Sequence, residues 1–274
     1  MTSLLLQHGV LHCVSHPFAT AMLVDGSVIT WIGDDDTART LGSRADRTVD
    51  LDGALVAPRF VDMPTAEALD VRGGAPAVRE ALDTLHRRAS HGHLPGDEAA
   101  VDRGLRRRRL SFLVDGAVPA DVFDRLVRWG VTMLVDLAGP DHADVPLASL
   151  ARAGVPYVLL PTVGDSPWET TRRAVHGLPP EHRVSARAAF RAQTRAAWRL
   201  SGDDLAGEIR IGQRAELSVW RAESVGVEDA TTGIATWSTD ARSGTPLLPV
   251  LGPEGPLPVR ELDVVSADVV STFA

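Results

Sequence analysis

The sequence predicts a mixed α/β fold in which a domain of alternating strands and helices is joined to a small β-rich domain. Three observations support this prediction. Continuous apolar runs within residues 111–161 alternate with helical patterns, which is typical of parallel strands buried between layers. Short strand-and-turn segments fill residues 4–58, and within them an Asp-Gly pair at residues 25–26 separates two short apolar runs, which is typical of a β-hairpin.

The N-terminal segment contains two hairpin signals. Asp25-Gly26 and Asp52-Gly53 each separate two short apolar runs, and Asp-Gly pairs in this setting are typical of two-residue β turns. Between them, three consecutive aspartates at residues 34–36 precede a helix predicted over residues 37–41. We interpret these carboxylates as a helix N-cap with an acidic first turn rather than as a metal site.

The central segment alternates between strand and helix patterns. Amphipathic helices are predicted over residues 75–90, 98–109, 119–129 and 145–153, and apolar strands over residues 111–115, 131–137 and 155–161. A longer helix is predicted over residues 185–200, with Ser185 as its N-cap. Roughly four to six strand-helix units fit between Phe60 and Leu200, whereas a closed barrel of such units requires about eight.

Composition excludes several classes of function. The 274 residues carry a net charge of −8 with a pI near 5.6, which argues against a nucleic-acid or membrane-surface role. No apolar run approaches the ~20 residues of a spanning helix, and the single Cys13 excludes an intramolecular disulfide. We therefore expect a cytoplasmic protein. All 28 basic residues are arginine, so neither a carbamylated lysine nor a lysine Schiff base can form.

Two stretches carry a family resemblance. VDGSVITWIG at residues 24–33 and VDLDGALVAPRFVD at residues 49–62 resemble the N-terminal strands of the amidohydrolase superfamily, in its long amidohydrolase-like subgroup of metal-dependent hydrolases. Arg59 stands where the family usually has glycine. The resemblance implies an incomplete TIM-barrel-like strand-helix domain over residues 59–202. It also implies a small composite β-sandwich built from residues 1–58 and 203–274, because residues 207–220 resemble the segment that leads the chain back to those strands.

The resemblance also implies where a metal would be held. In the family, a His pair on the first barrel strand, a His on each of two middle strands and an Asp after the last strand bind the catalytic metal. Here Pro64 and Ala66 replace the His pair, and Phe112 replaces one middle-strand His. None of these three side chains can coordinate zinc. The chain therefore departs from the family pattern at most of its ligand positions.

Some polar residues of the implied site remain. His93 and Asp97 resemble a relic of the other middle-strand motif, and Asp62 ends the match that leads into the barrel. With Phe112, these residues form the predicted ligand pocket. Asp165, in Gly-Asp-Ser-Pro after an apolar strand, matches the metal-binding and proton-accepting Asp of the family. The same Asp165 is also suited to cap the helix that begins near Pro167.

These residues favour an amidohydrolase-like protein that has lost metal-dependent catalysis and binds a small molecule or a protein partner, with no cofactor. One alternative is a divergent hydrolase of the carbon-nitrogen bond of a small amide or cyclic amide. It would use zinc, with Asp165 and His93 as surviving site residues. Another is a homo-oligomeric scaffold, in which a second copy covers the edges of a partial barrel.

Overall fold

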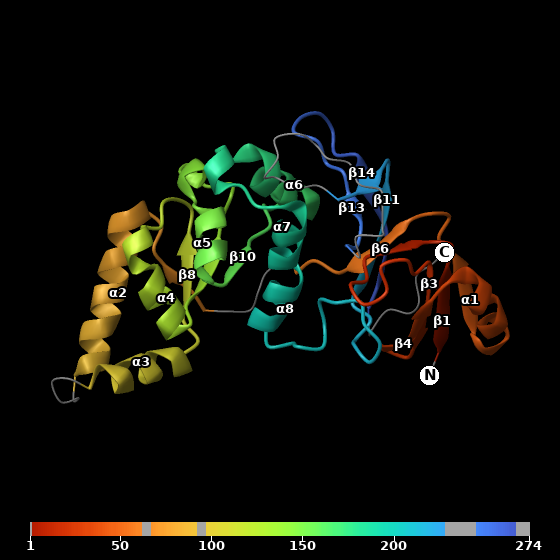
Figure 1. Cartoon of the computed structure of the whole chain (residues 1–274), viewed down its shortest axis with the longest axis horizontal. Helices are drawn as coiled ribbons and strands as arrows, with labels where there is room; N and C mark the ends of the chain where they lie inside the picture. Colours follow the sequence, from red (N-terminus) through yellow and green to blue (C-terminus); the bar gives the residue numbers. More distant parts are fainter. Residues whose placement is uncertain (1, 62–66, 92–96, 228–244, 267–274) are drawn as a thin grey trace. The chain divides into compact units, whose positions relative to one another are not determined.

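The structure is a computed structural model that describes residues 2–61, 67–91, 97–227 and 245–266 (Figure 1). It contains helices and several sheets, which confirms the predicted mixed α/β fold. The chain divides into two compact units: unit 1 comprises residues 1–61 and 197–274, and unit 2 comprises residues 62–196. None of the described helices is long and apolar enough to cross a membrane.

The first sheet of unit 1 has the strand order β4-β3-β1-β5. Its strands are β1 (Ser3–Gln7), β3 (Ala21–Asp25), β4 (Val28–Gly33) and β5 (Arg47–Asp50). β3 is antiparallel to β1 and β4, whereas β5 runs parallel to β1. Helix α1 (Asp35–Leu41) lies in the connection from β4 to β5.

The hairpin predicted at Asp25-Gly26 is confirmed, whereas Asp52-Gly53 forms a turn without a hairpin. Asp25 pairs with Val28 across a two-residue turn, in which Gly26 has a φ of 58°. At the second turn, Asp52 and Gly53 have φ values of 47° and 74°. The N–H of Ala54 donates a 2.9 Å hydrogen bond to the carbonyl oxygen of Leu51, so a tight turn forms there. The segments before and after this turn pair with other strands and not with each other.

The acidic run before α1 acts as the sequence predicts. Oδ1 of Asp34 accepts a 2.7 Å hydrogen bond from the backbone N–H of Thr37, and Asp35 and Asp36 occupy the first turn. The backbone N–H of Thr37 lowers the pKa of Asp34, with a smaller contribution from the Thr37 side chain. The three carboxylates are therefore explained by the helix terminus.

The second sheet of unit 1 joins strands from both ends of the chain, in the order β14-β11-β6-β2. These strands are β2 (Val10–Leu11), β6 (Leu55–Pro58), β11 (Leu217–Ala222) and β14 (Val259–Val265). β11 is antiparallel to both β6 and β14. A separate two-stranded pair contains β12 (Val225–Gly226) and β13 (Leu248–Pro249).

Side chains from both sheets of unit 1 share one hydrophobic cluster. Leu4, Leu6, Met22 and Val24 enter it from the first sheet, and Val56, Leu217, Val219 and Val265 enter it from the second. Each of these residues is almost completely buried. Burial of aliphatic side chains from distant segments is what stabilises unit 1, because each contributes about 1.5–3 kcal/mol of transfer free energy.

Unit 2 is built on a parallel sheet of strand order β10-β9-β8-β7. The strands are β7 (Leu69–Asp70), β8 (Ser111–Val114), β9 (Thr132–Val135) and β10 (Tyr157–Leu159). Strands that follow one another in the sequence are neighbours in the sheet, so the sheet grows in one direction from β7 to β10. This is the local arrangement of strand-helix units that the sequence predicts.

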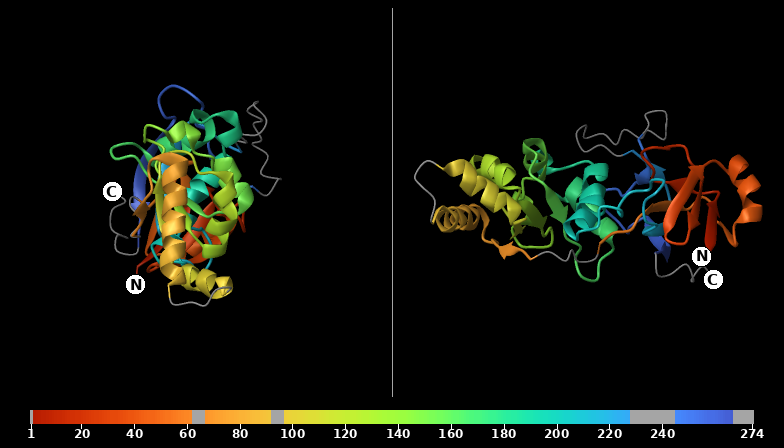
Figure 2. Two further views of the ribbon diagram at one scale, coloured as in Figure 1. Left: turned by 90° about the vertical axis from the view of Figure 1, so that its left-hand side faces the viewer. Right: turned by 90° about the horizontal axis from the view of Figure 1, so that it is seen from below.

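Helices separate the strands of unit 2 (Figures 1 and 2). Between the strands lie α2 (Gly74–Ser90), α3 (Glu98–Arg107), α4 (Phe123–Trp129) and α5 (Leu147–Ala153), and after β10 follow α6 (Pro167–Arg172) and α7 (Ala186–Gln193). α4 contacts α3 on one side and α5 on the other. α4 and α5 end at Gly130 and Gly154, whose φ values of 65° and 75° favour glycine.

The long helix predicted over residues 185–200 is wrong in one respect, because it is broken at Thr194. That residue has φ −110° and ψ −92°, so α7 ends at Gln193 and a separate helix, α8 (Arg195–Leu200), follows. Oγ1 of Thr194 donates a 2.9 Å hydrogen bond to the carbonyl oxygen of Phe190. A β-branched hydroxyl that bonds to the preceding turn competes with the helical backbone and bends or ends it.

Tyr157 on β10 provides a test of packing in unit 2. Burial raises its pKa from 10.0 to about 12. It is the only tyrosine in the chain, so we expect phenolate absorbance to titrate near pH 12 in the native protein and near pH 10 in denaturant. The stabilisation linked to this group is complete below pH 10 and is lost as the pH rises towards 12. A native midpoint near 10, with circular dichroism unchanged, would contradict the burial.

Candidate functional site

The carboxyl edge of the parallel sheet in unit 2 is the best-formed candidate site. In α/β sheets, ligands bind beyond the carboxyl ends of the strands, because the connecting loops there present side chains from neighbouring strands. Asp70 pairs with Leu113, and Leu113 pairs with Leu134. Arg72, Asp115 and Asp136 lie two residues further along their strands. We refer to Asp70, Arg72, Asp115 and Asp136 as the acidic edge.

Backbone hydrogen bonds hold the acidic edge in this register. The N–H of Val71 donates to the carbonyl oxygen of Leu113 at 3.0 Å, and the N–H of Asp136 donates to that of Val114 at 2.9 Å. Ladder pairing therefore continues one residue beyond each strand. It fixes the relative positions of Arg72, Asp115 and Asp136 before any side-chain contact is considered.

Arg72 is bound to Asp70 through a forked contact. Nε of Arg72 lies 3.0 Å from Oδ1 of Asp70, and Nη2 lies 2.5 Å from Oδ2. The Arg72 side chain and its backbone N–H lower the pKa of Asp70 from 3.8 to about 2. The hydrogen bonds that Arg72 donates to Asp70 raise the pKa of Arg72, and the charges of Asp115 and Asp136 add to the same effect. Arg72 thus lies within electrostatic range of all three carboxylates.

Asp115 differs from its neighbours because it is buried. Its residue is 7% exposed, and among the residues that the structure describes its Oδ1 has no hydrogen-bond partner. Asp136, in contrast, accepts a 2.8 Å hydrogen bond from the backbone N–H of Ala138. A buried carboxylate oxygen without a donor is unfavourable, so its presence in a folded protein requires an explanation.

A glycine makes room for Asp115. A β-carbon on Gly139 would lie 2.5 Å from Cβ of Asp115 and 3.0 Å from its Oδ2, closer than a side chain can approach. The carbonyl oxygen of Gly139 lies 2.8 Å from Nδ1 of His142, which anchors the loop. The absence of a side chain at residue 139 therefore allows the loop after β9 to cover Asp115.

Asp165 does not act as the predicted helix cap. Ser166 takes that role, with extended backbone angles and its Oγ 3.4 Å from the backbone N of Trp168. Oδ2 of Asp165 instead accepts a 2.9 Å hydrogen bond from Nη2 of Arg173. The same guanidinium donates to Oγ1 of Thr162 at 2.7 Å. The carboxylate that the family resemblance assigns to a metal is therefore paired with an arginine.

Asp97 lies away from the acidic edge. It caps α3, accepting a hydrogen bond from the backbone N–H of Ala100 at 3.3 Å. Helix α2 begins at Gly74, close after Arg72, and its 17 residues extend about 25 Å. Asp97 thus follows the far end of α2, and the structure does not bring it to the acidic edge.

Phe112 is a core residue of β8. It is 0% exposed and lies opposite Leu69 and Met133 on the neighbouring strands. The remaining predicted positions, Asp62, Pro64, Ala66 and His93, lie outside the described residues. Of the predicted site residues that the structure describes, Asp165 alone follows the carboxyl end of a strand.

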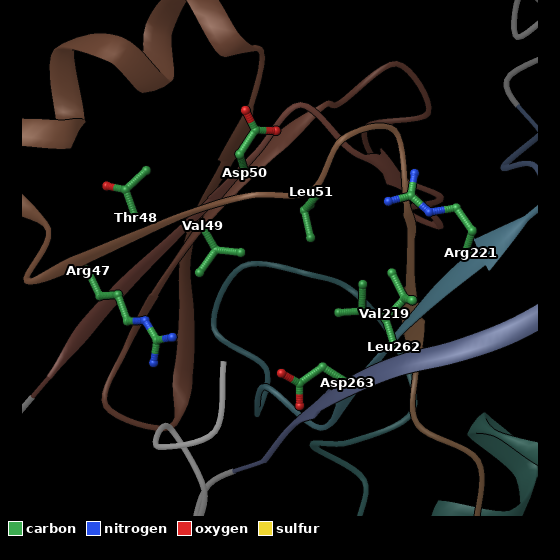
Figure 3. Close-up of a pocket in the computed structure, with 9 residues that line it drawn as sticks. All are labelled: Arg47, Thr48, Val49, Asp50, Leu51, Val219, Arg221, Leu262 and Asp263. Carbon is green, nitrogen blue, oxygen red and sulfur yellow. The ribbon is translucent and has the colours of Figure 1, made fainter. Parts of the chain in front are cut away.

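A cavity lies in unit 1, between the edge strands β5 and β14 (Figure 3). It has a volume of about 420 Å³ and is lined by Arg47, Thr48, Val49, Asp50, Leu51, Val219, Arg221, Leu262 and Asp263. Two of its charged side chains have partners within the chain: Oδ2 of Asp50 is 3.0 Å from Nδ1 of His8, and Nη2 of Arg221 is 3.3 Å from Oδ2 of Asp52. Among the described residues, no buried side-chain nitrogen or oxygen atom of this cavity lacks a hydrogen-bond partner, whereas Oδ1 of Asp115 at the acidic edge does.

The described side chains do not fit a zinc ion. Within residues 2–61, 67–91, 97–227 and 245–266, no group of three or more His, Cys, Asp or Glu is placed to hold a metal. A catalytic zinc needs at least three protein ligands and an open position. The carboxylate of Asp165 is in addition paired with the guanidinium of Arg173. The described residues therefore support no metal-dependent step.

Sequence reasoning missed Asp115 and Asp136, although a signal was present. Both β8 and β9 end in Leu-Val followed by Asp, at residues 113–115 and 134–136. A repeated strand ending of this kind, on adjacent parallel strands, predicts carboxylates at one edge of the sheet. This repeat is independent of the histidine pattern that the family resemblance implies.

Comparison with known proteins agrees with the fold. No protein-family model and no curated protein sequence matches the chain. In solved structures, the chain is similar to atrazine chlorohydrolase TrzN from Arthrobacter aurescens TC1, complexed with zinc, with a TM-score of 0.56 and 14% identity over 96% of this chain and 94% of that one.

An uncharacterised metal-dependent hydrolase from Pyrococcus furiosus is also similar. Its TM-score is 0.53, with 10% identity over 79% of this chain and 98% of that one. At such identities the comparison concerns the fold alone. At that level the comparison agrees with the predicted resemblance, because both structures are hydrolases described with a metal.

Proposed function

We propose that this chain is an amidohydrolase-like protein that binds a small molecule at the carboxyl edge of its parallel sheet and does not hydrolyse it. The observation that carries this proposal is the 2.9 Å contact between Asp165 and Arg173. A carboxylate bound to a guanidinium is a poor metal ligand and a poor proton acceptor, because both roles require the lone pairs that the arginine occupies.

The replacements at the implied metal site support the same proposal. Pro64 and Ala66 stand where the family resemblance expects two histidines, and Phe112 stands in place of a third. Loss of one ligand leaves a weakened site, whereas loss of three leaves too few ligands for zinc. We accordingly propose that the chain needs no metal or other cofactor.

The proposal extends to the architecture and setting of the site. We infer that the two sheets of unit 1 form the composite β-sandwich, since both contribute to one hydrophobic cluster. We also infer that the strands of unit 2 are a shortened barrel, because each follows its neighbour in parallel. The free, buried thiol of Cys13 is compatible with the cytoplasm.

Zinc content and turnover test this function together. The protein is purified without chelator, incubated with zinc, desalted and analysed for metal, and is then tested on a panel of small amides and cyclic imides. We expect less than stoichiometric zinc, the same content in Asp165→Ala, and no turnover above buffer. Asp124→Ala, at an exposed aspartate of α4, is the matched control.

The alternative is a divergent zinc hydrolase of carbon-nitrogen bonds, which the fold similarity to metal-dependent hydrolases favours. It predicts one zinc per chain and measurable turnover. Both would be lost in Asp165→Ala and kept in Asp124→Ala. That combination would overturn the non-catalytic proposal.

A further inference from the structure

We propose that the acidic edge binds the cationic group of a small molecule, an alkylammonium or alkylguanidinium, with Asp115 as the principal acceptor. This inference rests on the proposed binding function and specifies the chemistry of its ligand. It concerns the residues of the acidic edge, which differ from those that the family resemblance implies.

The first argument is charge. The acidic edge contains the carboxylates of Asp70, Asp115 and Asp136, and one guanidinium, that of Arg72. Three negative groups and one positive group leave an excess of negative charge at this edge of the sheet. A group of side chains with an excess of charge of one sign attracts ligands of the opposite sign.

The second argument is the unsatisfied oxygen. Oδ1 of Asp115 has no hydrogen-bond partner among the described residues, and the residue is 7% exposed. Arg72 directs Nε and Nη2 to Asp70. An ammonium or guanidinium would give Asp115 the N–H donor that it lacks, in a charge-assisted hydrogen bond of the stronger kind.

The third argument excludes a metal ion as occupant. A divalent ion requires several oxygen or nitrogen ligands, and the described part of the chain places no group of three suitable side chains together. An ammonium needs only acceptors in hydrogen-bond range, and its single charge suits a site already partly neutralised by Arg72. The geometry therefore points to an organic cation.

Binding of butylammonium and butylguanidinium tests this inference, with butanol and butyrate as neutral and anionic controls of matched length. Binding is followed by NMR shifts of the labelled protein. We expect both cations to bind more tightly than either control and to shift amides of residues 70–72, 115–116 and 136–139. Asp115→Asn should weaken cation binding by roughly tenfold or more, because one charge-assisted hydrogen bond is lost.

Two variants keep the test decisive. Asp124→Asn removes the same charge from an exposed position of α4 and should change cation binding less than twofold. Asp136→Asn should also weaken binding, and it replaces Asp115→Asn if that variant does not fold. Equal binding of cations and controls, or unchanged cation binding in the folded acidic-edge variant, would overturn the inference.

These outcomes are separable from failure of the proposed function. A protein that binds neither cation and also lacks zinc and turnover overturns only the ligand class. A protein with Asp165-dependent zinc and turnover overturns the proposed function, whatever it does with cations.

Discussion

Replacing Phe112 with alanine is expected to destabilise unit 2 by about 3–5 kcal/mol. The side chain is 0% exposed and lies on β8, between Leu69 of β7 and Met133 of β9. Truncation removes most of a ring from a site enclosed by neighbouring strands, so a cavity remains in addition to the lost transfer free energy. Urea denaturation, followed by circular dichroism and by fluorescence, measures the change.

The control is an apolar truncation at the surface of the same unit. Val163 is 97% exposed, so Val163→Ala should change the free energy of unfolding by less than about 0.5 kcal/mol. If Phe112 instead lined an open ligand pocket, its truncation would cost little and would enlarge that pocket. A loss below about 1 kcal/mol would therefore reject the core assignment of Phe112.

The burial of Phe112 in the core limits what the site can bind. A position that the family resemblance assigns to a metal-binding histidine is here part of the hydrophobic core. An imidazole buried there would need partners for its ring nitrogens. Return of a metal site would thus require repacking of the sheet as well as new ligands.

The features predicted well from the sequence depend on neighbouring residues. The turns at Asp25-Gly26 and Asp52-Gly53 and the cap at Asp34 each involve residues within four positions of one another. Backbone conformation and short-range hydrogen bonds determine these turns and this cap, and the residues involved all lie within a short stretch of sequence. The strands and helices of unit 2 follow for the same reason, because their periodicity is local.

The predictions that failed required a choice between competing local contacts. Asp165 and Ser166 are both good N-caps, and the outcome depends on Arg173, whose guanidinium binds Asp165 and leaves Ser166 to the helix. At Thr194, the hydroxyl competes with the helical backbone, and nothing in the helix pattern indicates which one prevails. Both outcomes depend on hydrogen bonds of polar side chains, about which the periodic pattern of apolar residues carries no information.

The acidic edge was beyond prediction for a different reason. Its definition requires the register of β7 against β8 and of β8 against β9, which brings Arg72 into the row of Asp115 and Asp136. Register is set by non-local packing of the sheet. The repeated Leu-Val-Asp endings indicate carboxylates at one edge, but they carry no information about Arg72 or about the burial of Asp115.

Replacing Gly139 with alanine is expected to destabilise the protein by about 1–3 kcal/mol and to weaken cation binding at the acidic edge. The new β-carbon would lie 2.5 Å from Cβ of Asp115. Neither side can yield easily: Asp115 is buried, and the loop is held by the 2.8 Å contact between Gly139 and His142. Thermal and urea unfolding measure the first effect, and butylammonium binding measures the second.

The same substitution at Gly104 should stabilise the protein instead of destabilising it. Gly104 lies within α3, and a β-carbon there would meet nothing within 4 Å. Alanine should therefore stabilise the helix by about 1 kcal/mol, because glycine loses more backbone entropy when it becomes helical. Cation binding should be unchanged. The contradicting result would be a Gly139→Ala variant that is as stable as Gly104→Ala and binds butylammonium as tightly as the parent. Gly139 would then not pack closely on Asp115, and the enclosure of the Asp115 carboxylate at the acidic edge would be wrong.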